Sequence, residues 1–226
     1  MPLGRGLLRF HEYGDAGVLV DVLDEDYTNR WTTTQAIGGA LRKNPPPGLV
    51  DVVASYQNVF VSFDPLVTDH AAVRAAIDSL ADGGQPRPAP RRFVIPVVYG
   101  GEFGPDLEAV ATLLGLSAEE VVERHSGQDW VVRFVGSPVG APMLDGPRLP
   151  RSIPRLREPR ARVEAGSVAV SGFQSMVYNA PSPGGWQLIG RTPIALFDLA
   201  HPPHVPYRAG DLVRFTRIGP HDWDRT

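Results

Sequence analysis

The chain has 226 residues, a formal net charge of −3 at pH 7, a hydrophobic content of 42% and no cysteine. This length accommodates one large domain or two small ones, and the negative charge offers no basic field for nucleic acid. The lack of cysteine excludes disulfides, thiolate nucleophiles and cysteine-ligated metal centres, and it favours a cytoplasmic location. No apolar run reaches the roughly 20 residues of a membrane helix, so we expect no membrane contact.

Residues 1–84 predict a small α+β domain. Its patterns follow the order strand–helix–strand–strand–helix, which is typical of a ferredoxin-like sandwich. The predicted strands cover 17–22, 50–56 and 58–63, and the predicted helices cover 28–41 and 69–80. Residues 85–92 (QPRPAPRR) are rich in proline, which blocks regular pairing and predicts an extended linker.

Residues 93–226 predict a second domain that contains a closed antiparallel sheet. A strand over 92–99 precedes two helices, and a strand over 130–135 follows them. After that, short apolar runs alternate with turns rich in glycine and proline, a cadence that is typical of a β-barrel. These runs are 167–170, 186–189, 194–197 and 211–215.

The two helices of the second domain are expected over 107–114 and 117–125. Ser117 and Glu120 have the spacing of a capping box, which supports a helix start at that point. His125 falls at the carboxyl end of the second helix, where the helix dipole favours a cationic imidazole. We therefore expect His125 to have a structural role.

Motifs that would assign a reaction directly are missing from the sequence. There is no Gly-x-Ser-x-Gly nucleophile elbow, no phosphate-binding loop and no dinucleotide fingerprint. His201 and His204 form a close pair, but the two prolines between them prevent a helix. A metal site there would need carboxylates from elsewhere, so a surface loop is expected and no metal is assigned.

The stretch Ser182-Pro183-Gly184-Gly185-Trp186 predicts a tight turn with neither strand nor helix. Proline lacks a backbone donor, and glycine adopts φ values that other residues avoid. With Arg191 close behind, the turn combines tight backbone, a flat ring and a positive charge, which suit a small acidic or amide-bearing ligand. The alternative is a strand-linking turn whose tryptophan only packs.

The segment 150–162 (PRSIPRLREPRAR) is rich in arginine. Prolines at short intervals keep it extended, so successive arginines project to different sides. Arginine forks suit carboxylate or phosphate groups. A solvated rim or a salt-bridged subunit contact explains the segment equally well.

Three long blocks of the sequence are 95–107 (IPVVYGGEFGPDL), 165–174 (AGSVAVSGFQ) and 182–193 (SPGGWQLIGRTP). They resemble the family called allophanate hydrolase subunit 1. The family includes the B subunit of bacterial 5-oxoprolinase, the kinase inhibitor KipI and subdomains C and D of the urea carboxylase carboxyltransferase domain. Residues 13–20 also resemble the family's opening strand, so the resemblance covers nearly the whole chain.

The resemblance implies a ferredoxin-like N-terminal domain followed by a cyclophilin-like β-barrel, within an α+β fold. It also implies a heteromer with the family's subunit 2 protein and, in the 5-oxoprolinase version, a third subunit. Such a complex opens a small cyclic amide or urea-derived substrate with ATP, while this chain alone binds no cofactor and is not catalytic. The alternative is a KipI-like inhibitor of a sensor histidine kinase, and a prolyl isomerase would rest on the barrel fold alone.

The same resemblance suggests roles for residues near the turn, although none of them is assigned a catalytic step. Gln174, Arg191 and Thr192 are expected to make polar contacts to substrate, and Trp186 is expected to form a pocket wall. Gly184 and Gly185 would allow a close backbone approach, and Arg155 or Arg160 would supply a charge for a carboxylate. The family's aromatic residues are absent from 135–144, and its glycine is replaced by Met176 in 174–179. These departures predict a pocket with different walls.

Overall fold

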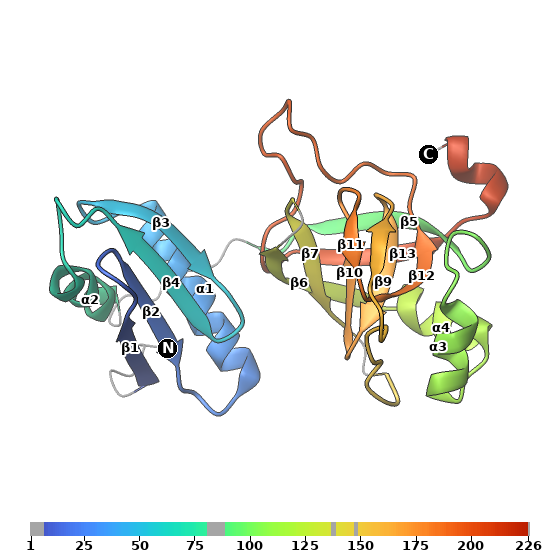
Figure 1. The fold of residues 1–226 in the computed structure, drawn as a ribbon, viewed down its shortest axis with the longest axis horizontal. Helices are drawn as coiled ribbons and strands as arrows, with labels where there is room; N and C mark the ends of the chain where they lie inside the picture. The colour runs from blue at the N-terminus through green and yellow to red at the C-terminus, as the bar shows by residue number, and fades with distance from the viewer. Residues whose placement is uncertain (1–6, 81–88, 137–138, 147–148, 226) are drawn as a thin grey trace. The chain divides into compact units, whose positions relative to one another are not determined.

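The computed structural model describes residues 7–80, 89–136, 139–146 and 149–225 (Figure 1). The chain divides into two compact units, Met1–Ala89 and Pro90–Thr226. Most of the expected linker, from residue 85 to residue 88, lies outside the described residues, and Arg92 already belongs to the first strand of the second unit.

The first unit is a four-stranded antiparallel sheet with two helices. Its strands run in the order β1-β2-β4-β3 across the sheet. The predicted strand–helix–strand–strand–helix segment is present, and β1 adds an edge strand that the sequence analysis missed. The elements are β1 (Leu8–Glu12), β2 (Gly17–Val22), α1 (Tyr27–Lys43), β3 (Leu49–Ala54), β4 (Asn58–Phe63) and α2 (His70–Ser79).

One face of this sheet holds the core of the first unit. Alternate residues of β2 and β4, among them Val20 and Val61, are fully buried against Ile37 of α1 and Ile77 of α2. Both helices therefore pack on the same face. In β1 no side chain is fully buried, and only Leu8 and Phe10 are partly buried.

The second unit is built around a closed barrel of seven strands in the order β10-β7-β6-β13-β5-β12-β9 (Figure 1). Neighbouring strands are antiparallel, except that β13 runs parallel to β5. The expected closed sheet is confirmed, and closure leaves these strands without a free edge. The strands are β5 (Arg92–Tyr99), β6 (Asp129–Gly136), β7 (Ala141–Asp145), β9 (Ser167–Ser171), β10 (Gln174–Val177), β12 (Gln187–Arg191) and β13 (Leu212–Arg217).

Two helices, α3 (Leu107–Leu114) and α4 (Ala118–Ser126), follow β5, and η3 (Pro220–Arg225) follows β13. The capping box between Ser117 and Glu120 is confirmed at the start of α4. Leucines and valines of α3 and α4 belong to the same core cluster as the barrel interior. The pair of helices therefore contributes to the barrel core.

The expectation of a cationic His125 is wrong. The imidazole is buried in the barrel core, with ring centroids 4.4 Å from Phe215 and 5.0 Å from Trp130. Burial lowers the pKa of His125 to about 3, so the ring is neutral at physiological pH. Its Nδ1 lies 2.8 Å from the Tyr99 hydroxyl and its Nε2 lies 2.9 Å from Ser175 Oγ.

A small two-stranded ribbon accompanies the barrel. It pairs β8 (Arg160–Val163) with β11 (Ser182–Gly184). The prediction that the Ser182 turn holds no strand is therefore wrong. The paired positions are Ser182 and Gly184, so Pro183 between them can lack an N–H without breaking the ladder.

The apolar run 194–197 forms no strand. The backbone N–H of Ile194 donates to Thr192 Oγ1 at 3.2 Å, and a side chain that bonds to nearby backbone in this way competes with a strand ladder. The run nevertheless supplies Leu196 to the barrel core.

Candidate functional site

The arginine-rich segment and the glycine turn, which the sequence identifies separately, lie side by side in the structure. The backbone N–H of Leu156 donates to the Gly185 carbonyl at 2.7 Å, and Gln187 Nε2 donates to the Pro154 carbonyl at 3.1 Å. The β8–β11 pairing continues the contact by placing Arg160 opposite Gly184. The two segments therefore form one polar surface.

Tyr178 lies directly beneath the turn. A Cβ on Gly184 would stand 2.3 Å from the Tyr178 hydroxyl oxygen, so only glycine allows the turn to approach this hydroxyl. Burial raises the pKa of Tyr178, while the backbone of Trp186 and the charges of Arg155 and Arg160 oppose that rise. The field of both arginines therefore reaches the hydroxyl.

A partly buried ion pair fixes Arg160. Its Nη2 donates to Asp106 Oδ1 at 2.8 Å, and the backbone N–H of Leu188 donates to Asp106 Oδ2 at 2.7 Å. Asp106 stands at the N-cap of α3 but makes no side-chain cap to that helix. Both carboxylate oxygens instead connect the start of α3 to β8 and β12.

Arg155 differs from Arg160 because its side chain is exposed. Its Nε lies 3.5 Å from the position that a Cβ on Gly185 would occupy, so the guanidinium group adjoins the turn. Within the described part of the chain, Arg155 makes no ion pair. It is therefore an exposed positive charge beside the turn, whereas Asp106 holds Arg160 in place.

Trp186 is half-buried and packs against a small apolar cluster that includes Met176, Tyr178 and Leu188. Met176 is itself buried, and it pairs across the sheet with Met143, which packs against the same cluster. The methionines thus fill space beside the tryptophan. The packing role that the sequence left open for Trp186 is therefore present in the structure.

Arg191 and Thr192 are engaged in contacts that hold the fold. Arg191 Nε donates to the Ala165 carbonyl at 2.9 Å, and its guanidinium lies over the ring of Trp223. Thr192 is 2% exposed, and its backbone N–H donates to Gly166 at 2.9 Å. These contacts pin β12 and η3, and neither residue is hydrogen-bonded to the turn.

Gln174 lies on β10, away from the contacts described for the turn. Its Nε2 donates to Asp145 Oδ1 at 3.0 Å, across the β10–β7 pair. The other carboxylate oxygen of Asp145 lies 3.3 Å from Arg133 Nε. The glutamine is therefore part of a polar cluster on β6, β7 and β10.

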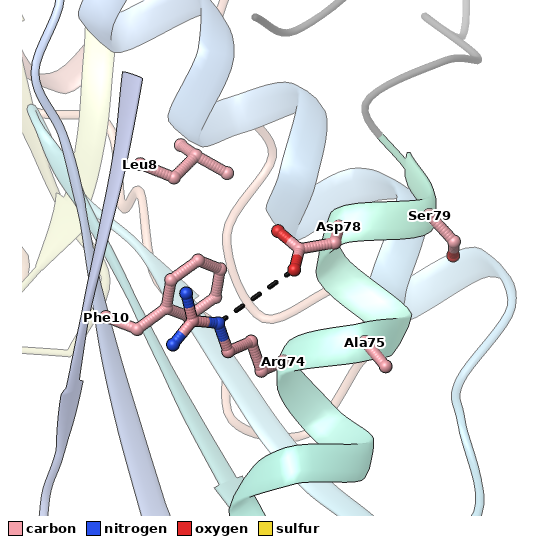
Figure 2. A pocket seen from close by; sticks show the side chains of 6 residues that line it. All are labelled: Leu8, Phe10, Arg74, Ala75, Asp78 and Ser79. Carbon is pink, nitrogen blue, oxygen red and sulfur yellow. Dashed lines mark ion pairs between the residues drawn. The ribbon is translucent and has the colours of Figure 1, made fainter. Parts of the chain in front are cut away.

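Figure 2 shows a shallow hollow in the first unit, between β1 and α2. The Arg74 guanidinium lies 4.7 Å from the centroid of the Phe10 ring, and Arg74 Nε lies 3.9 Å from Asp78 Oδ2. Leu8 lines the same hollow. An apolar floor with one exposed ion pair presents no reactive group, so the turn of the second unit is the better candidate.

The described residues offer neither a metal site nor a membrane-spanning helix. Within them, no group of three or more His, Cys, Asp or Glu side chains could hold a metal ion. Over the same residues, no helix is long and apolar enough to span a bilayer. His201 and His204 are exposed, and both hydrogen-bond to Asp198.

Tyr178 and Asp106 are the site residues that the sequence analysis missed. Asp106 follows a glycine and a proline and precedes a helix, which suggests only a helix cap. Tyr178 follows an apolar strand, where an aromatic residue is ordinary core. Asp106 joins the site through its contact with Arg160, and Tyr178 joins it through its contact with Gly184. Both contacts are long-range, so no local sequence pattern predicts them.

The chain is thus a two-unit α+β protein, with a small α+β unit and a seven-stranded barrel that the β8–β11 ribbon accompanies. The family model for carboxyltransferase domain, subdomain C and D, matches residues 8–207. The chain therefore belongs to this family.

Named relatives fit the same assignment. The B subunit of 5-oxoprolinase from Bacillus subtilis is 35% identical over 95% of both chains. The corresponding protein of Escherichia coli O157:H7 is 50% identical over 57% of this chain and 59% of its own. The crystallised protein TTHA0988 superposes with a TM-score of 0.78 and 34% identity, over 91% of this chain and 41% of its own. The chain thus spans less than half of that longer protein.

Proposed function

We propose that this chain is one subunit of a heteromeric, ATP-dependent hydrolase of the 5-oxoprolinase type. The substrate is a small cyclic amide, and the chain acts with a subunit 2 partner and a third subunit. The observation that carries the proposal is the 35% identity to the B subunit of a 5-oxoprolinase over 95% of both chains. A match of that extent includes both units of the fold.

The chemistry of the chain supports a subunit that is not catalytic alone. The turn offers arginines, a tyrosine hydroxyl and backbone groups, which bind and orient a ligand. Among the described residues near the turn there is no cysteine, no histidine and no lysine to act as a nucleophile or general base at neutral pH. The reactive groups and the nucleotide site are therefore assigned to the partner subunits.

Reconstitution tests this proposal. The chain is co-expressed with a candidate subunit 2 protein and a candidate third-subunit protein from the same organism, and ATP-dependent conversion of 5-oxoproline to glutamate is measured. We expect turnover from the complete mixture and none from this chain alone or from a mixture that lacks it. Arg74→Gln, in the hollow of the first unit, is the matched control and should leave the rate unchanged.

An absence of turnover with every subunit present would rule out the 5-oxoprolinase version. The same tagged chain, used as bait, distinguishes the alternative function. Recovery of a subunit 2 protein supports the hydrolase, whereas recovery of a sensor histidine kinase in its place supports an inhibitor.

A further inference from the structure

Two buried side-chain donors near the Gly184–Gly185 turn lack a hydrogen-bond partner among the described residues. These donors are Arg160 Nη1 and Ser182 Oγ. In the same part of the chain, the Tyr178 hydroxyl oxygen accepts a hydrogen bond from the backbone of Trp186, which leaves the hydroxyl proton to donate elsewhere, and Arg155 has no ion pair among the described residues. Buried polar groups in folded proteins nearly always have partners, so this set indicates a missing acceptor.

The geometry of Asp106 explains why the protein itself does not supply that acceptor to Arg160. One carboxylate oxygen accepts from Arg160 Nη2 and the other accepts from the backbone N–H of Leu188. Asp106 therefore cannot rotate toward Nη1 without releasing one of these bonds. A buried guanidinium N–H without an acceptor is unfavourable, and an incoming oxygen atom would relieve that penalty.

The charge around the turn favours an anionic acceptor. Asp106 balances Arg160, but Arg155 has no such partner, so the turn keeps an excess of positive charge. Glu158 lies between the two arginines in sequence, yet it is exposed and pairs with neither of them among the described residues. A carboxylate matches both the fork geometry of arginine and the unfilled donors.

We propose that the turn is a carboxylate subsite, in which Arg160 Nη1 and the Tyr178 hydroxyl donate to one small-molecule carboxylate and Arg155 adds the second positive charge. The subsite rests on the proposed function and sharpens it. A complex that uses it selects amides that carry a carboxylate over neutral ones such as urea. Asp106 acts as a positioning residue because it orients Arg160 without touching the ligand.

Direct binding tests the subsite independently of turnover. L-5-oxoproline and its neutral amide, 5-oxoprolinamide, are titrated into the full chain and into its complex with the subunit 2 partner. The backbone amide resonances of Gly184 and Gly185, or binding heats, report the affinity. We expect the acid to bind about tenfold more tightly than the amide, as expected for a lost charge-assisted hydrogen bond.

Variants locate the binding to the named donors. Arg155→Gln and Tyr178→Phe should each weaken binding of the acid about fivefold to tenfold, with little change for the neutral amide. Arg155 has no ion pair among the described residues, so the melting temperature of Arg155→Gln should stay close to that of the parent. Tyr178→Phe also removes the acceptor of the hydrogen bond from the Trp186 backbone, so its melting temperature should fall slightly, and its binding is measured well below that temperature. Arg157→Gln is the matched control, because it removes the same charge from the same segment and should bind normally.

Three outcomes would overturn the subsite. They are equal binding of acid and amide, no binding of either compound to the chain or its complex, and variants that weaken partner association but not acid binding. The last outcome would assign the donors to the subunit interface. Selective binding of the acid without ATP-dependent turnover would keep the subsite and remove the 5-oxoprolinase assignment.

Discussion

Acidification from pH 6.5 to pH 5 is expected to lower the free energy of unfolding of the barrel unit by about 2 kcal/mol through His125 alone. The pKa of His125 is lowered from its ordinary 6.5 to about 3 in the folded chain. Between these values the unfolded chain binds a proton that the folded chain does not. Stability is therefore complete above pH 6.5 and falls as the pH drops toward 3, by about 5 kcal/mol across the window.

The measurement compares the parent chain with His125→Gln, which retains donor and acceptor atoms but does not titrate. Urea unfolding is followed at several pH values by hydrogen exchange in β6, which contains Trp130 beside the imidazole. Carboxylates titrate in both proteins, so the difference in slope isolates His125. The exposed His201→Gln should keep the parent slope, and an identical slope in His125→Gln would contradict a neutral buried imidazole.

Replacement of Asp106 by alanine should destabilise the barrel unit by about 3 kcal/mol, because it leaves a largely buried guanidinium without its partner. The side chains of Arg160 and Asp106 are only 29% and 12% exposed. The same change also removes the acceptor for the Leu188 N–H. Asp106→Asn should lose less, because its carbonyl oxygen can still accept one of these bonds.

An exposed ion pair of the same unit provides the control. Arg217 and Glu119 are 56% and 57% exposed, and Glu119→Ala should reduce stability by less than about 1 kcal/mol. Urea midpoints at pH 7 measure all three variants. Equal losses for Asp106→Ala and Glu119→Ala would show that the Asp106 carboxylate does not join α3, β8 and β12.

Elements whose signal is local could be predicted from the sequence. The strands 17–22, 58–63 and 92–99 and the helix 107–114 have the expected bounds, because their apolar spacing or capping residues suffice. The ribbon could not be predicted in this way. Its short strand contains Pro183, and its pairing with β8 depends on residues about twenty positions away.

The candidate site shows the same limit. Residue type alone identified the glycine turn and the arginines, because their chemistry is distinctive. It could not show that Asp106 immobilises Arg160, that Tyr178 lies beneath Gly184, or that contacts holding the fold occupy Arg191 and Thr192. The charge state of His125 also could not be predicted, because the end of a helix favours the cationic ring whereas the interior of a barrel favours the neutral ring.

The parallel pairing of β13 with β5 sets the order in which this chain can fold. Leu212 pairs with Arg92, and the family match ends at residue 207, before β13 begins. During synthesis, the facing edges of β5 and β6 stay open until β13 has left the ribosome. The β5–β13 contact forms slowly because the two strands are distant in sequence, and unpaired strand edges can pair with other chains and aggregate. A partner subunit or chaperone that shields these edges during translation would therefore raise the yield of folded protein.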